Sequence, residues 1–137
     1  MASRLLDRDV SATVAVAASA EQTWRALLVV LGIDAEVPGV PAAYGAMAGR
    51  VRDAVPGDGL VVRGRLGART YEFSAHLVAR GVWCDLTVDA APDDLVGAVE
   101  GGRWRHHLAR RRVRQLVRDL VTDVARTAGS GAGPVSR

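Results

Sequence analysis

The chain has 137 residues, which suits one domain that buries its apolar surface without disulfides and is too short for two independent cores. Its composition, 49% hydrophobic and 24% charged, excludes an intrinsically disordered chain. The 18 basic residues are all arginine and outnumber the 15 acidic ones, which gives a net charge of +3. This balance fits a GC-rich genome and leaves nucleic-acid binding open as an alternative.

The lone cysteine and the N-terminus bear on the compartment. Cys84 excludes an internal disulfide and a cysteine-cluster metal site, in agreement with a reducing environment. A signal peptide is not indicated, because Asp7 and Asp9 interrupt the basic region and Ser11 and Thr13 interrupt the apolar one. No stretch approaches the roughly 18 apolar residues of a membrane span. We therefore expect a cytoplasmic protein that does not bind membranes.

The chain divides into one body and two ends. Residues 1–8 are expected to be a flexible leader, and the Gly- and Ser-rich residues 127–137 a flexible tail. A single domain is expected over residues 9–126. It opens with a strand over 10–17, in which the valines alternate with small or polar residues.

A helix with clear boundaries follows this strand. Ser19 and Gln22 have the spacing of a capping box, and Gly32 marks the end of the helix. Between them apolar residues recur at helical spacing: Trp24, Leu27, Leu28 and Leu31. The next segment, 33–44, contains two prolines and Gly39, and is interpreted as a loop or a short broken helix.

Strand patterns then recur at 46–54, 59–66, 70–79 and 82–90, separated by short glycine-containing turns. Short turns predict antiparallel pairing between neighbours. The last two strands each alternate between a polar and an apolar face, and the apolar residues are Tyr71, Phe73, Ala75, Leu77, Cys84, Leu86 and Val88.

A long amphipathic helix is predicted to close the domain. We expect it to begin at Pro92 and to run to about Arg126, with a kink at Gly101-Gly102. One apolar stripe follows its length: Leu95, Val99, Ala109, Val113, Leu116, Val117, Leu120 and Val124. This order of elements predicts an α+β helix-grip fold, a curved antiparallel sheet wrapped around the long C-terminal helix.

Both ends of the body carry a family resemblance. The opening strand-to-helix unit from Ser11 to Leu28, and the closing strand Thr87-Val88-Asp89 before the arginine-rich helix, resemble the START-related, polyketide cyclase/dehydrase-like superfamily, often called SRPBCC. The resemblance implies a cavity between sheet and C-terminal helix that holds a hydrophobic, polyketide-like or aromatic small molecule. Some members use it for aromatase/cyclase chemistry and others for binding alone. The chain departs from the family in its five predicted strands and in residues 36–41, which replace the usual Trp-Pro segment.

Two titratable residues are the candidate catalytic groups. Tyr71 lies on the apolar face of its strand, where its hydroxyl could orient or protonate a ligand carbonyl. His106 joins the apolar stripe if the last helix is unbroken, which would make it an acid or base in the pocket. If the glycine kink shifts the helical phase, His106 and His107 lie on the surface instead. The expected pocket lining is Phe73, Leu77, Leu86, Ala109, Val113 and Leu116.

The remaining reactive side chains predict neither a metal nor a cofactor. Cys84 lies among apolar neighbours and is interpreted as a core residue. His76 faces the polar side of its strand, with no second histidine or carboxylate at ligand spacing. The glycines match neither a phosphate-binding loop nor a dinucleotide fingerprint.

The last helix holds the densest cluster of positive charge: Arg103, Arg105, Arg110, Arg111, Arg112, Arg114 and Arg118. A phosphate-binding surface is one interpretation. A solvated helix face is favoured, because Asp119 and Asp123 follow closely and Trp104 is the only aromatic residue nearby. We therefore do not expect a nucleic-acid partner.

A protein-interaction domain is the main alternative to a ligand-binding one. Trp83, or the pair Trp104 and Leu108, falls outside the predicted core. Aromatic residues left outside a core often mark interfaces. Such a surface would contact a partner protein or a second copy of the chain, which would give a homodimer.

Overall fold

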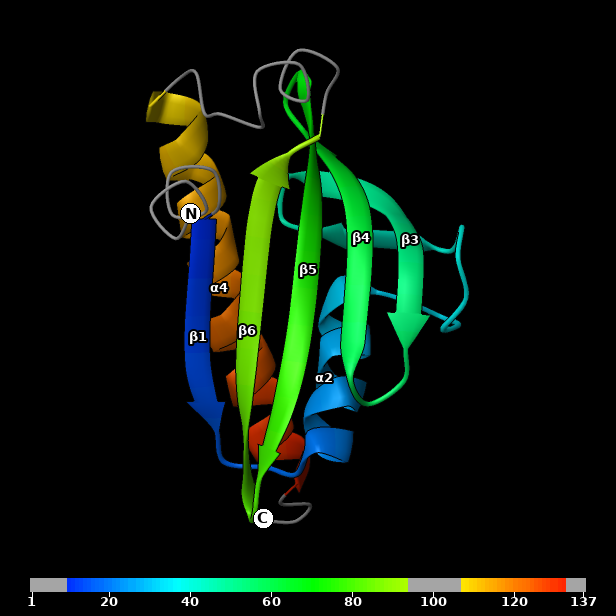
Figure 1. The fold of residues 1–137 in the computed structure, drawn as a ribbon, viewed down its shortest axis with the longest axis vertical. Coiled ribbons are helices and arrows are strands. Elements are labelled where there is room, and N and C mark those ends of the chain that lie inside the picture. The colour runs from blue at the N-terminus through cyan, green and yellow to red at the C-terminus, as the bar shows by residue number, and fades with distance from the viewer. Residues whose placement is uncertain (1–9, 94–106, 133–137) are drawn as a thin grey trace, which may run out of the picture.

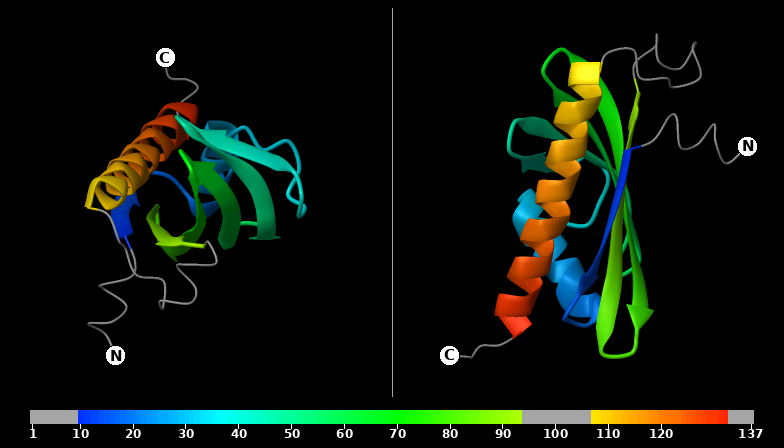
Figure 2. Two further views of the ribbon diagram at one scale, coloured as in Figure 1. Left: turned by 90° about the horizontal axis from the view of Figure 1, so that it is seen from above. Right: turned by 90° about the vertical axis from the view of Figure 1, so that its left-hand side faces the viewer.

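The computed structural model describes residues 10–93 and 107–132. Six strands form one antiparallel sheet in the order β1-β6-β5-β4-β3-β2, and helices α2 and α4 lie on its concave side (Figures 1 and 2). This is the α+β helix-grip fold predicted from the sequence. The elements are β1 (Val10–Val16), α2 (Ala20–Leu31), β2 (Pro41–Tyr44), β3 (Met47–Val55), β4 (Gly59–Leu66), β5 (Arg69–Arg80), β6 (Trp83–Pro92) and α4 (His107–Ala132).

Local sequence signals account for α2. The Ser19 Oγ accepts a hydrogen bond from the Gln22 backbone N–H at 3.1 Å, and the Ser19 N–H donates to Gln22 Oε1 at 3.0 Å. Gly32 ends the helix in the left-handed region, at φ 67°. The buried side of the helix contains Trp24, Leu27 and Leu31. The predicted capping box is confirmed, and the apolar side of the helix packs against the sheet and α4.

The two-residue alternation of the central strands is also confirmed. Cys84, Leu86 and Val88 are buried on β6, whereas His76 on the opposite face of β5 is exposed. The register places Phe73 opposite Ala90 across the β5–β6 pair. The apolar face of the sheet therefore points toward the two helices.

Two expectations about the irregular segments are wrong. Pro41–Tyr44, expected to be part of a loop, forms β2 and pairs with β3. An edge strand tolerates Pro41 because one side of its backbone needs no ladder partner. Pro92, expected to open the last helix, ends β6 instead and pairs with Tyr71. The strand is prolonged there by tertiary pairing, and the Asp93 N–H continues it by donating to the Thr70 carbonyl at 2.8 Å.

The C-terminal helix also extends beyond its expected end near Arg126. It continues to Ala132, although the sequence there is rich in glycine and serine. Ala128 is buried in the core, with 2% of its surface exposed. Packing of this side chain offsets the low helix propensity of Gly129, so part of the expected tail belongs to the folded body.

A pair of glycines lets the sheet curve between β3 and β4. Gly49 and Gly64 are register partners, and a Cβ atom on Gly49 would lie 2.1 Å from the Arg63 carbonyl oxygen. A Cβ atom on Gly64 would lie 2.5 Å from the Sδ of Met47. The missing side chains therefore allow a close approach of the strands, and they leave room for Met47 to cross Gly64 into the interior.

Both edges of the sheet contact α4, and one of these contacts is a side-chain hydrogen bond. At one edge β1 lies along α4, whereas at the other the Tyr44 hydroxyl of β2 donates a hydrogen bond to the Asp123 carboxylate of α4. Arg126 pairs with the same carboxylate at 2.8 Å. Burial, and then the bond to Asp123, raise the pKa of Tyr44, so the phenol stays protonated as the donor.

Candidate ligand-binding site

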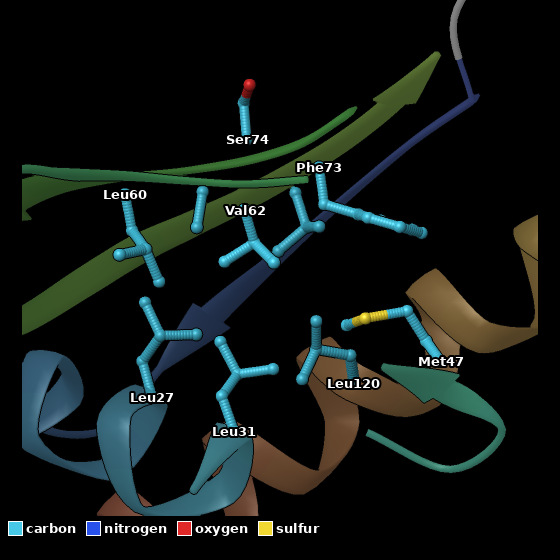
Figure 3. Close-up of a pocket in the computed structure, with 10 residues that line it drawn as sticks. Leu27, Leu31, Met47, Leu60, Val62, Phe73, Ser74 and Leu120 are labelled. Carbon is cyan, nitrogen blue, oxygen red and sulfur yellow. The ribbon is translucent and has the colours of Figure 1, made fainter. Parts of the chain in front are cut away.

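The structure contains a small internal void between the sheet and the two helices (Figure 3). Its volume is about 10 Å³, which accommodates at most about one water molecule. Figure 3 shows the Ser74 hydroxyl pointing away from the void, on the other side of the sheet. The remaining lining is entirely apolar: Leu27, Leu31, Met47, Leu60, Val62, Phe73, Ala75, Val88 and Leu120.

A larger hollow opens at the end of the molecule where α4 begins, beside the β4–β5 turn. This outer cleft has a volume of about 330 Å³. Gly67, at φ 66°, allows the tight turn that brings the end of β4 and the start of β5 to one wall. The full lining is Leu66, Gly67, Ala68, Arg69, Tyr71, Leu108, Ala109 and Arg112.

An aromatic pair stands between the two hollows. Tyr71 lines the outer cleft and Phe73, two residues further along β5, lines the internal void. The ring centroids are 6.1 Å apart with an interplanar angle of 61°, an edge-to-face contact. Tyr71 is only 2% exposed and Phe73 only 4%, so the pair forms a packed partition between the cleft and the interior.

The structure brings some of the sequence-predicted site residues together. Tyr71 and Ala109 line the outer cleft, and Phe73 lines the internal void. His106 lies outside the described residues. The other four expected lining residues are buried in the core and line neither hollow: Leu77, Leu86, Val113 and Leu116.

Sequence reasoning missed the two arginines of the outer cleft. Arg69 was not singled out, and Arg112 was assigned to a solvated helix face. Leu108, Ala109 and Arg112 stand at i, i+1 and i+4 on α4, so they share one side of the helix. Ala109 belongs to the predicted apolar stripe, and Arg112 follows it by three residues on the same side of the helix. This spacing could have indicated that Arg112 lies beside the pocket.

Cys84 does not line this cleft. It is fully buried, and burial is the main cause that raises the pKa of its thiol. The core interpretation is therefore confirmed. The described residues contain no group of three or more His, Cys, Asp or Glu side chains that could hold a metal ion. Within 10–93 and 107–132, neither helix has the length and apolar character to cross a membrane.

Solved structures share this fold. DynU16, from the dynemicin biosynthetic locus, matches with a TM-score of 0.67 and 19% identity over 91% of this chain and 48% of that chain. The Zhui aromatase/cyclase from Streptomyces sp. R1128 matches at 0.58 and 22%, over 93% and 99% of the two chains. Ara h 8.0201 matches at 0.63 and 11%, over 89% and 97%.

These comparisons concern the fold. This chain spans about half the length of the DynU16 chain that it matches, and all three identities lie below 25%. No family model and no curated protein matches the sequence. The chain shares the helix-grip fold of these solved structures, which is the fold expected from its sequence.

Proposed function

We propose that this helix-grip protein binds a hydrophobic, polyketide-like or aromatic small molecule at the outer cleft, next to the Tyr71–Phe73 partition. The observation that carries the proposal is the size and position of the cleft. Its volume of about 330 Å³ falls at the lower end of ligand sites, which span about 300–1,000 Å³. Its lining also includes Tyr71, whose ring packs against Phe73 at the border of the apolar interior.

A catalytic version of this function would be of the cyclase/aromatase type. The similarity in fold to an aromatase/cyclase supports it, and Tyr71 is the residue proposed to act. Its phenol would donate a hydrogen bond to a ligand carbonyl and so stabilise the negative charge that develops on this oxygen when a base accepts the adjacent proton. The cleft itself would act by holding the ligand in one orientation and excluding water. His106 is retained as a proposed second acid or base.

A fluorescence titration with the uncharged probe N-phenyl-1-naphthylamine tests binding at the cleft. We expect a single probe per chain, with an unchanged circular dichroism spectrum. Ala109→Trp should fill the cleft and reduce affinity at least about tenfold. Val29→Trp is the matched control, because Val29 is 70% exposed on α2 and does not line the cleft. Binding that Ala109→Trp leaves unchanged would overturn the proposal.

The β5–β6 turn supports a second candidate, an interaction surface. Val78, Val82 and Trp83 are 48%, 85% and 47% exposed, so large apolar side chains gather at one turn. We propose that this turn contacts a second copy of the chain and gives a homodimer. Light scattering after size exclusion should then report a dimer that Trp83→Ser converts to a monomer. A monomeric parent protein would exclude this candidate.

A further inference from the structure

We infer that the outer cleft selects ligands in which a negative charge adjoins an aromatic body, such as small aromatic acids. The inference rests on the proposed function and adds the class of ligand to it. Two arginines and the Tyr71 phenol are the polar side chains of the lining, and the rest is apolar or glycine. Among the described residues, the lining contains no carboxylate.

The two guanidinium groups approach the cleft from different elements. Arg69 belongs to β5 directly after the turn, and Arg112 belongs to the second turn of α4. An anion between them would receive hydrogen bonds from both walls. Guanidinium groups suit this task because their planar donors match the oxygens of a carboxylate.

Two acidic residues near the start of β5 are paired with arginines that do not line the cleft. Asp93 lies 3.1 Å from Arg63, and Glu72 pairs with Arg52. In the part of the chain that the structure describes, Arg112 forms no ion pair with an acidic residue. Arg112 is therefore a positive charge that a bound anion would neutralise.

The first turns of α4 reinforce this positive potential. Residues 107–118 contain five arginines and no acidic residue, and Asp119 is the first carboxylate of the helix. Charges of one sign around a cleft raise the local concentration of ligands of the opposite sign. The potential therefore favours an anion over a neutral ligand of the same shape.

The apolar part of the lining favours an aromatic body in the ligand. Leu66 and Ala109 are half-buried, and Leu108 is 72% exposed. A flat aromatic body laid over Leu108 would remove this surface from water and would gain hydrophobic binding energy. With a volume of about 330 Å³, the cleft suits a small ring system better than a long extended chain.

Two probes that share one aromatic body test the inference. 1-Anilinonaphthalene-8-sulfonate has the same skeleton as N-phenyl-1-naphthylamine and carries an added sulfonate. We expect Arg112→Gln to weaken binding of the sulfonate probe about fivefold and to change binding of the neutral probe less than about twofold. Raising the salt concentration should reproduce this difference.

Arg118→Gln provides the matched control, because Arg118 is exposed on the same helix and does not line the cleft. It should change both affinities less than about twofold, because Arg118 adds only to the general positive potential of the helix. The double variant Arg69→Gln, Arg112→Gln should weaken the sulfonate probe about twentyfold. Circular dichroism confirms that each variant is folded.

The outcomes separate the inference from the proposed function. If neither probe binds, the proposed function fails. If both probes bind and Arg112→Gln affects them equally, the proposed function stands and the selection for anions is wrong. An equal loss of the sulfonate probe in Arg118→Gln would assign its binding to the general charge of the helix, which also overturns the inference.

Discussion

The internal void and the outer cleft differ in what surrounds them. The void lies beneath the middle of the sheet and is lined by aliphatic side chains and Phe73. The outer cleft lies at the start of α4, where strand, turn and helix contribute arginines and a phenol as well as leucines. One aromatic contact, Tyr71 against Phe73, separates them. The interior therefore stabilises the fold, whereas the proposed recognition site lies where the elements diverge.

Removing the partition is expected to have the largest effect. Phe73→Ala should lower the free energy of unfolding by about 3–4 kcal/mol, because it deletes a buried ring and leaves a cavity. It should also strengthen binding of the neutral probe by joining the void to the cleft. Chemical denaturation and probe titration measure the two results.

Tyr71→Phe serves as the comparison, because it keeps both rings and removes only the hydroxyl. Tyr71→Phe should lower the free energy of unfolding by about 1 kcal/mol. A loss of less than about 1 kcal/mol for Phe73→Ala would show that the ring pair is not packed as described.

Thiol reactivity compares the two regions directly. Cys84 is fully buried and its pKa is raised, so few thiolates form and they are inaccessible. A cysteine in place of Ala68, an exposed residue of the cleft, should react with a disulfide reagent at least about a hundredfold faster than Cys84. In denaturant the two rates should converge. Equal rates in the native protein would mean that the interior opens readily.

The bond between Tyr44 and Asp123 holds the second edge of the sheet to α4. Tyr44→Phe should lower the free energy of unfolding at neutral pH by about 1–2 kcal/mol. Arg126→Gln, which removes an exposed ion pair from the same carboxylate, should cost less than about 0.5 kcal/mol. Equal losses in the two variants would contradict a special role for the phenol.

The same bond predicts a pH dependence. The pKa of Tyr44 is raised above its ordinary value of about 10, so folding favours the neutral phenol. This stabilisation is fully present below about pH 10 and is lost as the pH rises through the raised pKa of Tyr44 in the folded protein. The difference in stability between the parent protein and Tyr44→Phe should therefore shrink above about pH 10.

Nucleic-acid binding is expected to show the smallest effect. The arginines of α4 outside the cleft share the helix with Asp119 and Asp123, so few counterions would be released. Anisotropy with single-stranded DNA should show weak binding that disappears by about 0.2 M salt. Arg118→Gln should change it less than about twofold. Salt-resistant, sequence-selective binding would reverse this ranking.

Elements with strong local signals were predictable from the sequence. The capping box at Ser19 and Gln22 and the alternation from Tyr71 to Leu77 depend on neighbours within a few residues. β2 was missed because Pro41–Tyr44 is short and is stabilised mainly by its pairing with β3. Pro92 misled for a similar reason, since pairing with Tyr71 outweighed its usual place at a helix start.

The fold class, the apolar faces of α2, β5 and β6 and the burial of Cys84 follow from the sequence alone, because periodicity and capping are local properties. The space that remains between those faces depends on tertiary packing. Met47 lies over Gly64 and lines the void together with Leu27, Leu31 and Leu120, and this void measures only about 10 Å³. Tertiary packing also brings Arg69 and Arg112 to one cleft, although 43 positions separate them in the chain. Such volumes and juxtapositions depend on side chains from distant segments meeting, which no local pattern specifies.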